Sequence, residues 1–214
     1  MVFVLTKESS IANHFLAGLR DKTVQKDPER FRKNMERLGE LMAYEISKRL
    51  EFQQREIQTP LGTAKTQLLS QSPVLVTVLR AGIPFFNGFQ NYFNFSEAGF
   101  VGAYRQEGSE DITIKLDYLA TPSLEGRDLI LIDPMLATGK SFIKAAETLA
   151  KNGRPRHVYV AAVVAAPEGI AYIESKMKLP FSIFTVAVDN GLNDHAYIVP
   201  GLGDAGDLSF GEKR

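Results

Sequence analysis

Five nearly continuous apolar runs, separated by helix-like segments, restrict the fold more than any other feature of this sequence. They are rich in β-branched and aromatic residues and lie at Val74–Leu79, Phe100–Tyr104, Leu129–Ile132, Val158–Val164 and Ile183–Val188. Helical patterns occupy the segments between them, at Pro84–Tyr92, Ser141–Lys151 and Pro167–Lys178. Strands that are apolar on both faces and alternate with helices are typical of a buried parallel sheet. We therefore predict an α/β fold, with a mostly parallel sheet flanked by helices.

Two amphipathic helices are predicted before the first of these strands. The earlier one carries apolar residues at helical spacing, namely Ile11, Phe15 and Leu19. The later one begins at Asp27-Pro28, a helix cap followed by proline at the first helical position. Its apolar stripe consists of Phe31, Met35, Leu38 and Met42.

Three further segments fall outside the alternation of strands and helices. Glu56–Thr59 and Thr63–Leu68 flank a Pro-Leu-Gly turn, which predicts a hairpin. The polar stretch Gln106–Tyr118 predicts an arm that leaves the sheet, and the chain after Val188 is Gly-rich and irregular. We predict one domain over residues 1–214, which comprises N-terminal helices and a hairpin (1–70), a core (71–188) and a tail that folds over it like a hood (189–214).

Composition excludes several classes of protein. The 214 residues include no cysteine, which rules out disulfides, thiolate metal sites and a cysteine nucleophile. The 25 basic residues balance 25 acidic ones, which argues against an extended nucleic-acid surface. The longest apolar stretch, Val158–Ala166, is too short to span a bilayer, and the first residues lack a signal-peptide pattern. We expect a cytoplasmic protein that binds neither DNA nor a membrane.

Charged residues follow three of the predicted strands directly. Arg80 follows the first apolar run, Arg105 the second and Asp133 the third. Ligands of open parallel sheets bind beyond the carboxyl ends of the strands, so these side chains are expected to converge. Two arginines and an aspartate suit a polyanion held together with a metal ion.

The loop from Asp133 to Ser141 is the sharpest local signal. A strand, a Thr-Gly turn and a helix start would present backbone N–H groups to an anion at the positive end of the helix dipole. An ordinary helix cap at Thr138 or Ser141 explains the same residues about equally well, so the loop alone leaves both interpretations open. The Gly-Lys-Ser ending also matches a Walker A loop, but that motif requires glycine where Pro134 stands.

Two segments carry long and specific motifs. In Leu131–Gly139 a single Asp precedes Pro-Met-Leu-Ala-Thr-Gly, and this segment is similar to the loop for 5-phosphoribosyl 1-diphosphate (PRPP) in uracil phosphoribosyltransferases. Tyr197–Asp207 reads YIVPGLGDAGD and is similar to the family's uracil-binding tail. Shorter matches extend the resemblance from about residue 70 to the end, at Leu79–Gly82, Tyr104-Arg105, Ala165–Gly169 and Gly191–Asn193.

The resemblance implies a phosphoribosyltransferase fold and a pentosyltransferase that converts uracil and PRPP to UMP and diphosphate in pyrimidine salvage. The residues it implies for PRPP are Arg80, Arg105, Asp133, Pro134, Met135, Leu136, Ala137, Thr138, Gly139, Lys140, Ser141 and Asp204. Those it implies for uracil, mainly through backbone groups, are Ile198, Gly203, Asp204 and Ala205. The catalytic set it implies is Arg80, Arg105, Asp133 and Asp204.

Cofactor and assembly are also expectations from the resemblance. Mg²⁺ would be carried by the diphosphate, with no protein ligand directly assigned and Asp204 near enough to act through water. Asp204 is also a candidate general base for uracil N1, whereas His14, His157 and His195 are not expected to be catalytic. Relatives form homodimers or homotetramers, so a homo-oligomer is expected; some are activated by GTP, which makes GTP a candidate effector with no site assigned in this sequence.

Three residues depart from the family's usual pattern. Lys140 replaces glycine, Asn87 replaces aspartate, and Leu208 replaces a basic residue. They leave an alternative open, in which the chain keeps the fold but senses nucleotides or RNA as a regulator with little catalysis. Balanced charge and the intact tail favour the enzyme.

Overall fold

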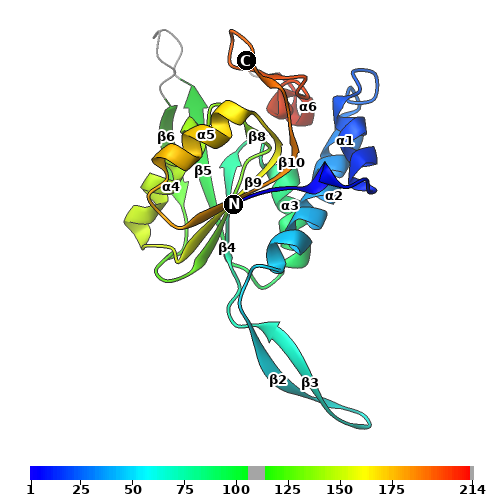
Figure 1. Cartoon of the computed structure of the whole chain (residues 1–214), viewed down its shortest axis with the longest axis vertical. Helices are drawn as coiled ribbons and strands as arrows, with labels where there is room; N and C mark the ends of the chain where they lie inside the picture. The colour runs from blue at the N-terminus through cyan, green and yellow to red at the C-terminus, as the bar shows by residue number, and fades with distance from the viewer. Residues whose placement is uncertain (106–113, 213–214) are drawn as a thin grey trace.

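A mostly parallel sheet forms the centre of the molecule. The computed structural model describes residues 1–105 and 114–212, with the side chains of 103–105 and 114–117 outside the description. Within those residues the sheet has eight strands in the order β1-β10-β9-β7-β4-β5-β6, and β8 pairs with β9 (Figure 1). The predicted strands are confirmed as β4 (Val74–Leu79), β5 (Ala98–Arg105), β7 (Asp128–Ile132), β9 (His157–Ala165) and β10 (Phe181–Val188).

Two edge strands differ from the prediction. β1 (Val2–Val4) pairs in parallel with β10, although the N-terminal region was expected to be helical. β6 (Ile114–Ala120) pairs antiparallel with β5, so the part of the expected arm from Ile114 to Tyr118 belongs to the sheet. The remainder of that arm, residues 106–113, lies outside the described part of the chain.

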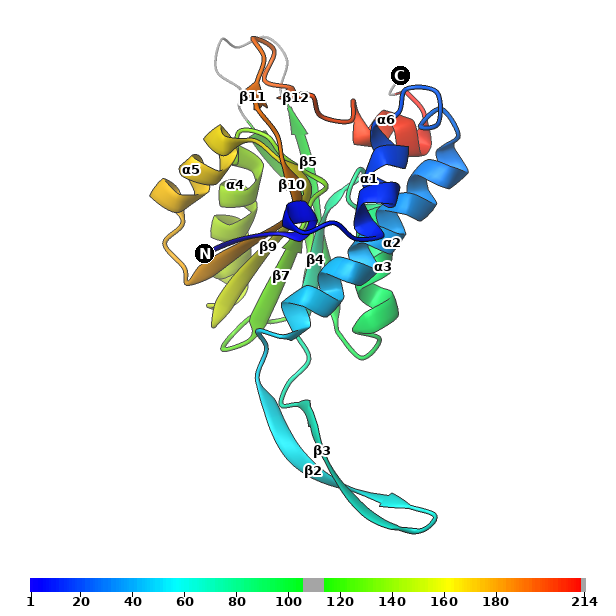
Figure 2. The same ribbon diagram turned by 45° about the vertical axis from the view of Figure 1, so that its right-hand side comes forward.

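Helices cover both faces of the sheet, as Figure 2 shows. α4 (Lys140–Leu149, followed by the short η2, Ala150–Asn152) and α5 (Pro167–Lys176) lie on one face. α1 (Ala12–Arg20), α2 (Pro28–Ser47) and α3 (Ile83–Tyr92) lie on the other, where η1 (Leu5–Lys7) joins β1 to α1. Alternate residues of one strand serve the two cores: Leu75 packs with α1–α3, and Val74 and Val76 pack with α4 and α5. This two-sided burial explains the continuous apolar runs.

The second N-terminal helix follows its sequence pattern more closely than the first. The Asp27 carboxylate caps α2 by accepting hydrogen bonds from the N–H groups of Glu29 and Arg30. The predicted stripe of α2, from Phe31 to Met42, is fully buried. In α1 the prediction was partly wrong, because Ile11 precedes the helix and is 57% exposed. The buried face of α1 is Ala12, Leu16 and Leu19.

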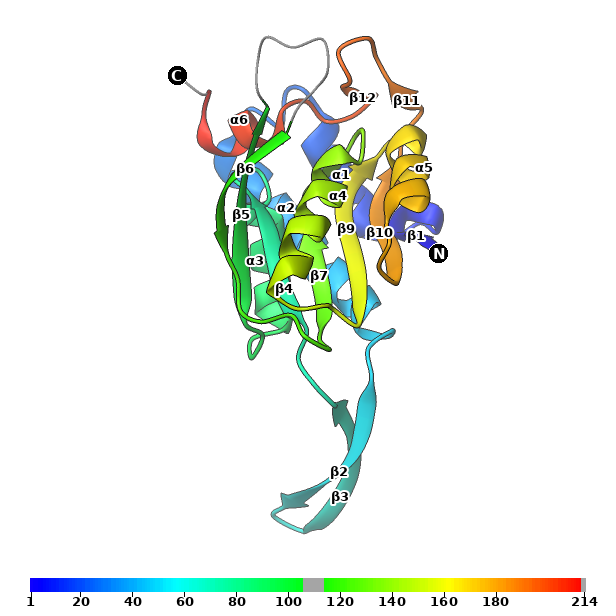
Figure 3. The ribbon, with the colours of Figure 1, turned by 90° about the vertical axis from the view of Figure 1, so that its left-hand side faces the viewer.

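Two smaller units lie at opposite ends of the molecule (Figures 1 and 3). The predicted hairpin is confirmed and longer than expected, with β2 (Phe52–Thr59) paired to β3 (Gly62–Leu69), and it projects away from the body. At the other end lies the tail, which comprises β11 (Gly191–Leu192), β12 (Ile198–Val199) and α6 (Ala205–Phe210). The division of residues 1–214 into one domain stays a prediction.

No helix among the described residues is both long and apolar enough to cross a membrane.

Candidate functional site

The carboxyl ends of two adjacent parallel strands bring Arg80 and Asp133 to one edge of the sheet. β4 and β7 pair in register up to Thr77 and Ile132. The Thr77 hydroxyl also donates a hydrogen bond to the Ile132 carbonyl at 3.1 Å. The backbone of Arg105 ends β5, on the other side of β4, and its side chain lies outside the described residues.

The predicted PRPP loop folds back on its own aspartate. The Asp133 carboxylate accepts a hydrogen bond from Met135 N–H at 3.1 Å. Met135 and Leu136 then form the short strand β8 beside β9. Gly139 occupies the cap position of α4 with a φ of 75°, which favours glycine. The loop therefore turns sharply from the sheet edge into the first turn of α4.

The helix-cap interpretation of this loop receives only partial support. Gly139 caps α4 without any side-chain hydrogen bond, and Ser141 lies within the helix. The Thr138 hydroxyl accepts from Lys140 N–H at 3.4 Å, a long hydrogen bond. Lys140 is the first residue of α4, next to the predicted phosphate-binding amides. Side-chain capping therefore does not account for the whole loop, and its N–H groups can still bind an anion.

Close backbone contact with α5 holds the loop in place. A Cβ on Gly169 would lie 2.3 Å from the Ala137 carbonyl oxygen, and one on Gly139 would lie 2.7 Å from the Gly169 carbonyl oxygen. Side chains at these positions would push the two backbones apart. The Ala165–Gly169 motif thus supports the loop, a role that the sequence alone did not reveal.

Arg80 joins the sheet edge to the tail. Its Nη2 lies 2.7 Å from an Asp207 carboxylate oxygen and donates a hydrogen bond to the Gly211 carbonyl at 2.7 Å. The peptide between Leu79 and Arg80 is cis. Through these contacts α6 packs at the carboxyl end of β4, so two segments far apart in the sequence meet at the predicted site.

Asp204 is the N-cap of α6. Its Oδ1 accepts hydrogen bonds from Gly206 N–H at 2.8 Å and from Asp207 N–H at 2.9 Å. This gives the residue a local structural role that the sequence analysis did not assign. No described group of three or more His, Asp or Glu side chains forms a metal-binding cluster around it or elsewhere.

The predicted uracil residues lie in a tightly folded part of the tail. Ile198 and Ala205 are buried. Between them Gly201 and Gly203 have φ values of 60° and 87°, in the left-handed region. A Cβ on Gly201 would lie 2.2 Å from the Ile198 carbonyl oxygen, so the chain folds closely upon itself there.

Side chains from distant elements fix this tail, and sequence reasoning missed them. The buried Asp189 carboxylate accepts from Gly201 N–H at 2.9 Å and pairs with Arg20 at 2.6 Å. The Gln25 side chain donates to the Leu202 carbonyl at 3.4 Å. The Glu168 carboxylate accepts from Leu192 N–H at 3.1 Å. Nothing in the sequence indicates these partners, because each bond joins residues that are far apart along the chain.

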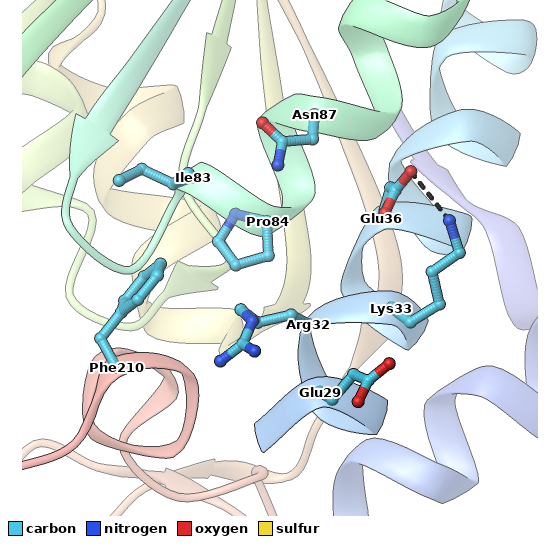
Figure 4. A pocket seen from close by; sticks show the side chains of 8 residues that line it. All are labelled: Glu29, Arg32, Lys33, Glu36, Ile83, Pro84, Asn87 and Phe210. Carbon is cyan, nitrogen blue, oxygen red and sulfur yellow. Dashed lines mark hydrogen bonds and ion pairs between the residues drawn. The ribbon is translucent and has the colours of Figure 1, made fainter. Parts of the chain in front are cut away.

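The structure shows what surrounds two of the residues that depart from the family pattern. Leu208 packs against the core, where a Cβ on Gly203 would lie 3.5 Å from its Cδ1. Asn87 lines a pocket between α2, α3 and α6 (Figure 4). Its other lining residues are Glu29, Arg32, Lys33, Glu36, Ile83, Pro84 and Phe210, none of which is a predicted substrate residue.

Known proteins resemble the chain along nearly its whole length. Residues 6–212 match the family profile described as uracil phosphoribosyltransferase. A uracil phosphoribosyltransferase of Porphyromonas gingivalis is 45% identical over 213 residues, with 99% of both chains covered. One from Pyrococcus furiosus is 37% identical over 209 residues, covering 96% of this chain and 88% of that protein.

A solved structure supports the same relationship. The AQ2163 protein of Aquifex aeolicus superimposes with a TM-score of 0.88 at 32% identity and covers 99% of this chain and 98% of its own. Profile, sequence and structure therefore agree with the two motifs at the sheet edge and in the tail, and the chain belongs to the uracil phosphoribosyltransferase family.

Proposed function

We propose that this chain converts uracil and PRPP to UMP and diphosphate. The observation that carries the proposal is the contact between Arg80 and Asp207, which brings the tail to the strand ends where the PRPP loop begins. A base-reading segment and a phosphate-binding loop then share one edge of the sheet. That is where ligands of such sheets bind.

The residues at the strand ends would hold PRPP. The guanidinium groups of Arg80 and Arg105 suit diphosphate, because each can form two parallel charge-assisted hydrogen bonds. Asp133 would accept hydrogen bonds from the ribose hydroxyls. The 5′-phosphate would lie at the loop amides from Ala137 to Ser141, at the positive end of α4. Catalysis would consist mainly of positioning and of stabilising the negative charge on the departing diphosphate.

The tail would read uracil through its backbone. Uracil presents alternating acceptors and a donor, which fixed N–H and C=O groups of Ile198, Gly203 and Ala205 can match. Cytosine reverses the polarity at N3 and at the 4-substituent and would leave buried groups unpaired, each at a cost of about 1–3 kcal/mol. The left-handed turns at Gly201 and Gly203 support this proposal because they place successive peptide groups in a fixed orientation.

Asp204 would accept the proton from uracil N1 as the base attacks the anomeric carbon. Its Oδ1 already caps α6, so the role requires its second oxygen. The Asp204→Asn variant separates the two roles, because asparagine also caps helices well. A large fall in kcat with retained stability would support the proton transfer. Weaker substrate binding at unchanged kcat would contradict it.

Mg²⁺ belongs to the proposal as an ion carried by the diphosphate. At this end of the sheet the chain offers Asp133 and Asp204, and each accepts backbone hydrogen bonds. Such a sparse set suits Mg²⁺, which binds through one or two carboxylates together with substrate phosphates. When bound, the ion would neutralise charge on the leaving diphosphate.

Assembly as a homodimer or homotetramer is a separate proposal. The β2–β3 hairpin carries exposed apolar side chains, with Ile57 at 43%, Leu68 at 45% and Leu61 at 100% exposure. A lone two-stranded hairpin is only marginally stable in water, so a second copy of the chain is the proposed partner. Activation by GTP and a cytoplasmic location stay predictions.

The test of the activity is UMP formation from labelled uracil and PRPP with Mg²⁺. We expect turnover that Asp204→Ala lowers by about 100-fold or more. The matched Asp194→Ala change, at an exposed position of the same tail, should leave turnover unchanged. Binding of both substrates without turnover would instead favour the regulator with little catalysis.

A further inference from the structure

The carboxylate of Asp189 links two parts of the molecule that are distant in sequence. Asp189 directly follows β10, and its side chain is only 4% exposed. One oxygen lies 2.6 Å from Nη2 of Arg20, at the end of α1. The other accepts a hydrogen bond from Gly201 N–H at 2.9 Å. The carboxylate therefore ties the tail to α1 across 169 residues of sequence.

A second side chain from the same region bonds to the next residue of the tail. Gln25, in the connection between α1 and α2, donates from Nε2 to the Leu202 carbonyl at 3.4 Å. The same nitrogen lies 3.3 Å from the Leu19 carbonyl, which holds the side chain against the end of α1. Successive residues of the tail, Gly201 and Leu202, are thus bound through their N–H and C=O groups. We call Arg20, Gln25 and Asp189 the tail clamp.

The clamp acts on the segment between the proposed uracil contacts. Gly201 and Leu202 connect Ile198 to Gly203, and a rotation of either peptide would move both ends. A charged acceptor makes a shorter and stronger hydrogen bond to an N–H group than a neutral one does. A buried ion pair adds little net stability compared with apolar packing of similar volume. Here each oxygen of the carboxylate also bonds to a different group, which fixes the two groups relative to each other. The clamp is therefore better suited to orientation than to folding.

We infer that Asp189 is a positioning residue for the base, which orients the Gly201–Leu202 backbone and thereby sets affinity and selectivity for uracil. The inference rests on the proposed function, since it names what holds the base-reading segment of that site. Asp189 and Arg20 are not placed against the substrate. Most of the residues proposed for PRPP lie in the loop after β7, and no described hydrogen bond or ion pair joins a clamp side chain to that loop. The clamp should therefore affect uracil and spare PRPP.

The experiment compares Asp189→Asn and Arg20→Met with wild type. In Asp189→Asn one carboxylate oxygen becomes an amide nitrogen, so either Arg20 or Gly201 N–H loses its acceptor. We expect the KM for uracil to rise at least tenfold and the KM for PRPP to stay within twofold. The ratio of cytosine to uracil turnover should rise as well. Arg20→Lys, which keeps the charge, should restore part of the loss seen in Arg20→Met.

Controls separate positioning from folding. Asp194→Asn, in the exposed turn of the same tail, should change neither KM. Calorimetric titration with PRPP and the Tm of each variant report whether the fold survives. Equal losses for both substrates in proportion to Tm would show a purely structural role and overturn the inference. Unchanged uracil KM would overturn it as well.

Measurements on the wild-type protein separate a failure of the inference about Asp189 from a failure of the proposed function. UMP formation by wild type, with unaltered kinetics in the clamp variants, overturns the inference alone. Wild-type protein that neither binds uracil by calorimetry nor forms UMP overturns the proposed function and the inference together.

Discussion

The C-terminal tail and the β2–β3 hairpin are both built from small elements outside the sheet, yet they are held in different ways. The hairpin has two eight-residue strands in continuous antiparallel register. The tail has two strands of two residues each and a six-residue helix. Judged by local backbone pairing, the hairpin is the more regular unit. The hairpin is nevertheless less well packed against the rest of the molecule, since Leu61 at its tip is fully exposed.

Contacts with the rest of the molecule account for the difference. Side chains from α1, from α5 and from the residue that follows β4 bond to the tail, through Arg20, Glu168 and Arg80. In the hairpin the side chains of Gln58 and Thr63 bond to each other across the two strands. Side-chain bonds from distant elements fix an irregular segment in one conformation, and regular pairing alone does not place a hairpin against the body. Under the proposed function, the tail would thus be preorganised for uracil, and the hairpin would be the surface for a second copy of the chain.

A substitution inside the tail, at Gly201, should have the largest effect on the KM for uracil. In Gly201→Ala, a Cβ 2.2 Å from the Ile198 carbonyl forces the two peptides apart. We expect the KM for uracil to rise by about 100-fold or more, equivalent to the loss of two buried hydrogen bonds. Steady-state kinetics with uracil and PRPP measure this. Gly126→Ala is the matched control, because its φ of 68° carries the same strain with no atom within 4 Å. Similar kinetics in both variants would contradict the prediction.

The hairpin can be tested by removing its apolar side chains. The double variant Ile57→Ser, Leu61→Ser should shift the protein from oligomer to monomer, because these exposed side chains would lose their buried partner surface. Sedimentation velocity over a range of protein concentrations measures the shift. Gln67→Ser, a polar change on the same hairpin, should leave the oligomer intact. A wild-type protein that sediments as a monomer would refute the assembly.

The contact between Arg80 and Asp207 should have a smaller influence. Asp207 holds the guanidinium that the proposed site assigns to diphosphate, and both side chains are about one-third exposed. Partly exposed ion pairs contribute about 0.2–1 kcal/mol. Asp207→Asn should therefore release Arg80 and lower the KM for PRPP by roughly two- to fivefold. A rise in that KM would mean that the pair positions Arg80 instead of competing for it, and Asp194→Asn is the control.

Sequence alone predicted the parts of the fold that repeat a strong pattern. The central strands were predicted because neighbouring residues face two different apolar cores, as Val74 and Leu75 do, which makes each strand apolar throughout. The helices α3–α5 were predicted from the helical patterns between these strands. β1 was missed because three partly exposed residues, Val2–Val4, become a strand only by pairing with β10. Ile11 was misplaced because a helix boundary, here at Ala12, decides which spaced residues face inward.

The candidate site also contains some residues that could be predicted from the sequence and others that could not. Arg80, Asp133 and the loop to Ser141 could be predicted because they follow strands whose carboxyl ends meet at one edge. Their substrate roles stay predictions. Asp189 also follows a predicted strand, but its pairing with Arg20 could not be predicted, because nothing in the sequence indicates that two charged residues 169 positions apart are partners. Only the folded chain shows that the two are paired, and this lies beyond any local pattern.

A substitution at the end of the sheet nearest the hairpin should have the smallest effect. It should change the free energy of unfolding and leave substrate binding unchanged. There Arg156 pairs with Asp128 and with Glu51, the residue before β2. His157, which starts β9, lies 3.0 Å from the Ser182 hydroxyl and packs against Tyr159. Burial lowers the pKa of His157 below its ordinary value of 6.5, and Asp128 partly opposes the shift while the N-terminal amine and Arg156 add to it.

The direction of the pH dependence follows from that lowered pKa. Below about pH 6.5 the unfolded chain binds a proton at His157 that the folded chain resists, so the free energy of unfolding should fall as pH falls. The loss continues down to the folded-state pKa and then levels off, whereas above pH 6.5 the contribution is fully present. The contribution should be small, because the ring is partly exposed and solvent screens its charge.

His157→Gln removes this titration while keeping a polar group beside Ser182. Urea unfolding at pH 7.5 and at pH 5 should show a smaller difference in unfolding free energy for the variant than for wild type. The KM for uracil should be the same in both proteins, because His157 begins β9 while the tail lies beyond the other end of the sheet. An equal pH dependence in the two proteins would assign it to other groups. An altered KM for uracil would show that the two ends of the sheet are coupled, and the contrast between the anchored tail and the hairpin end would then no longer hold.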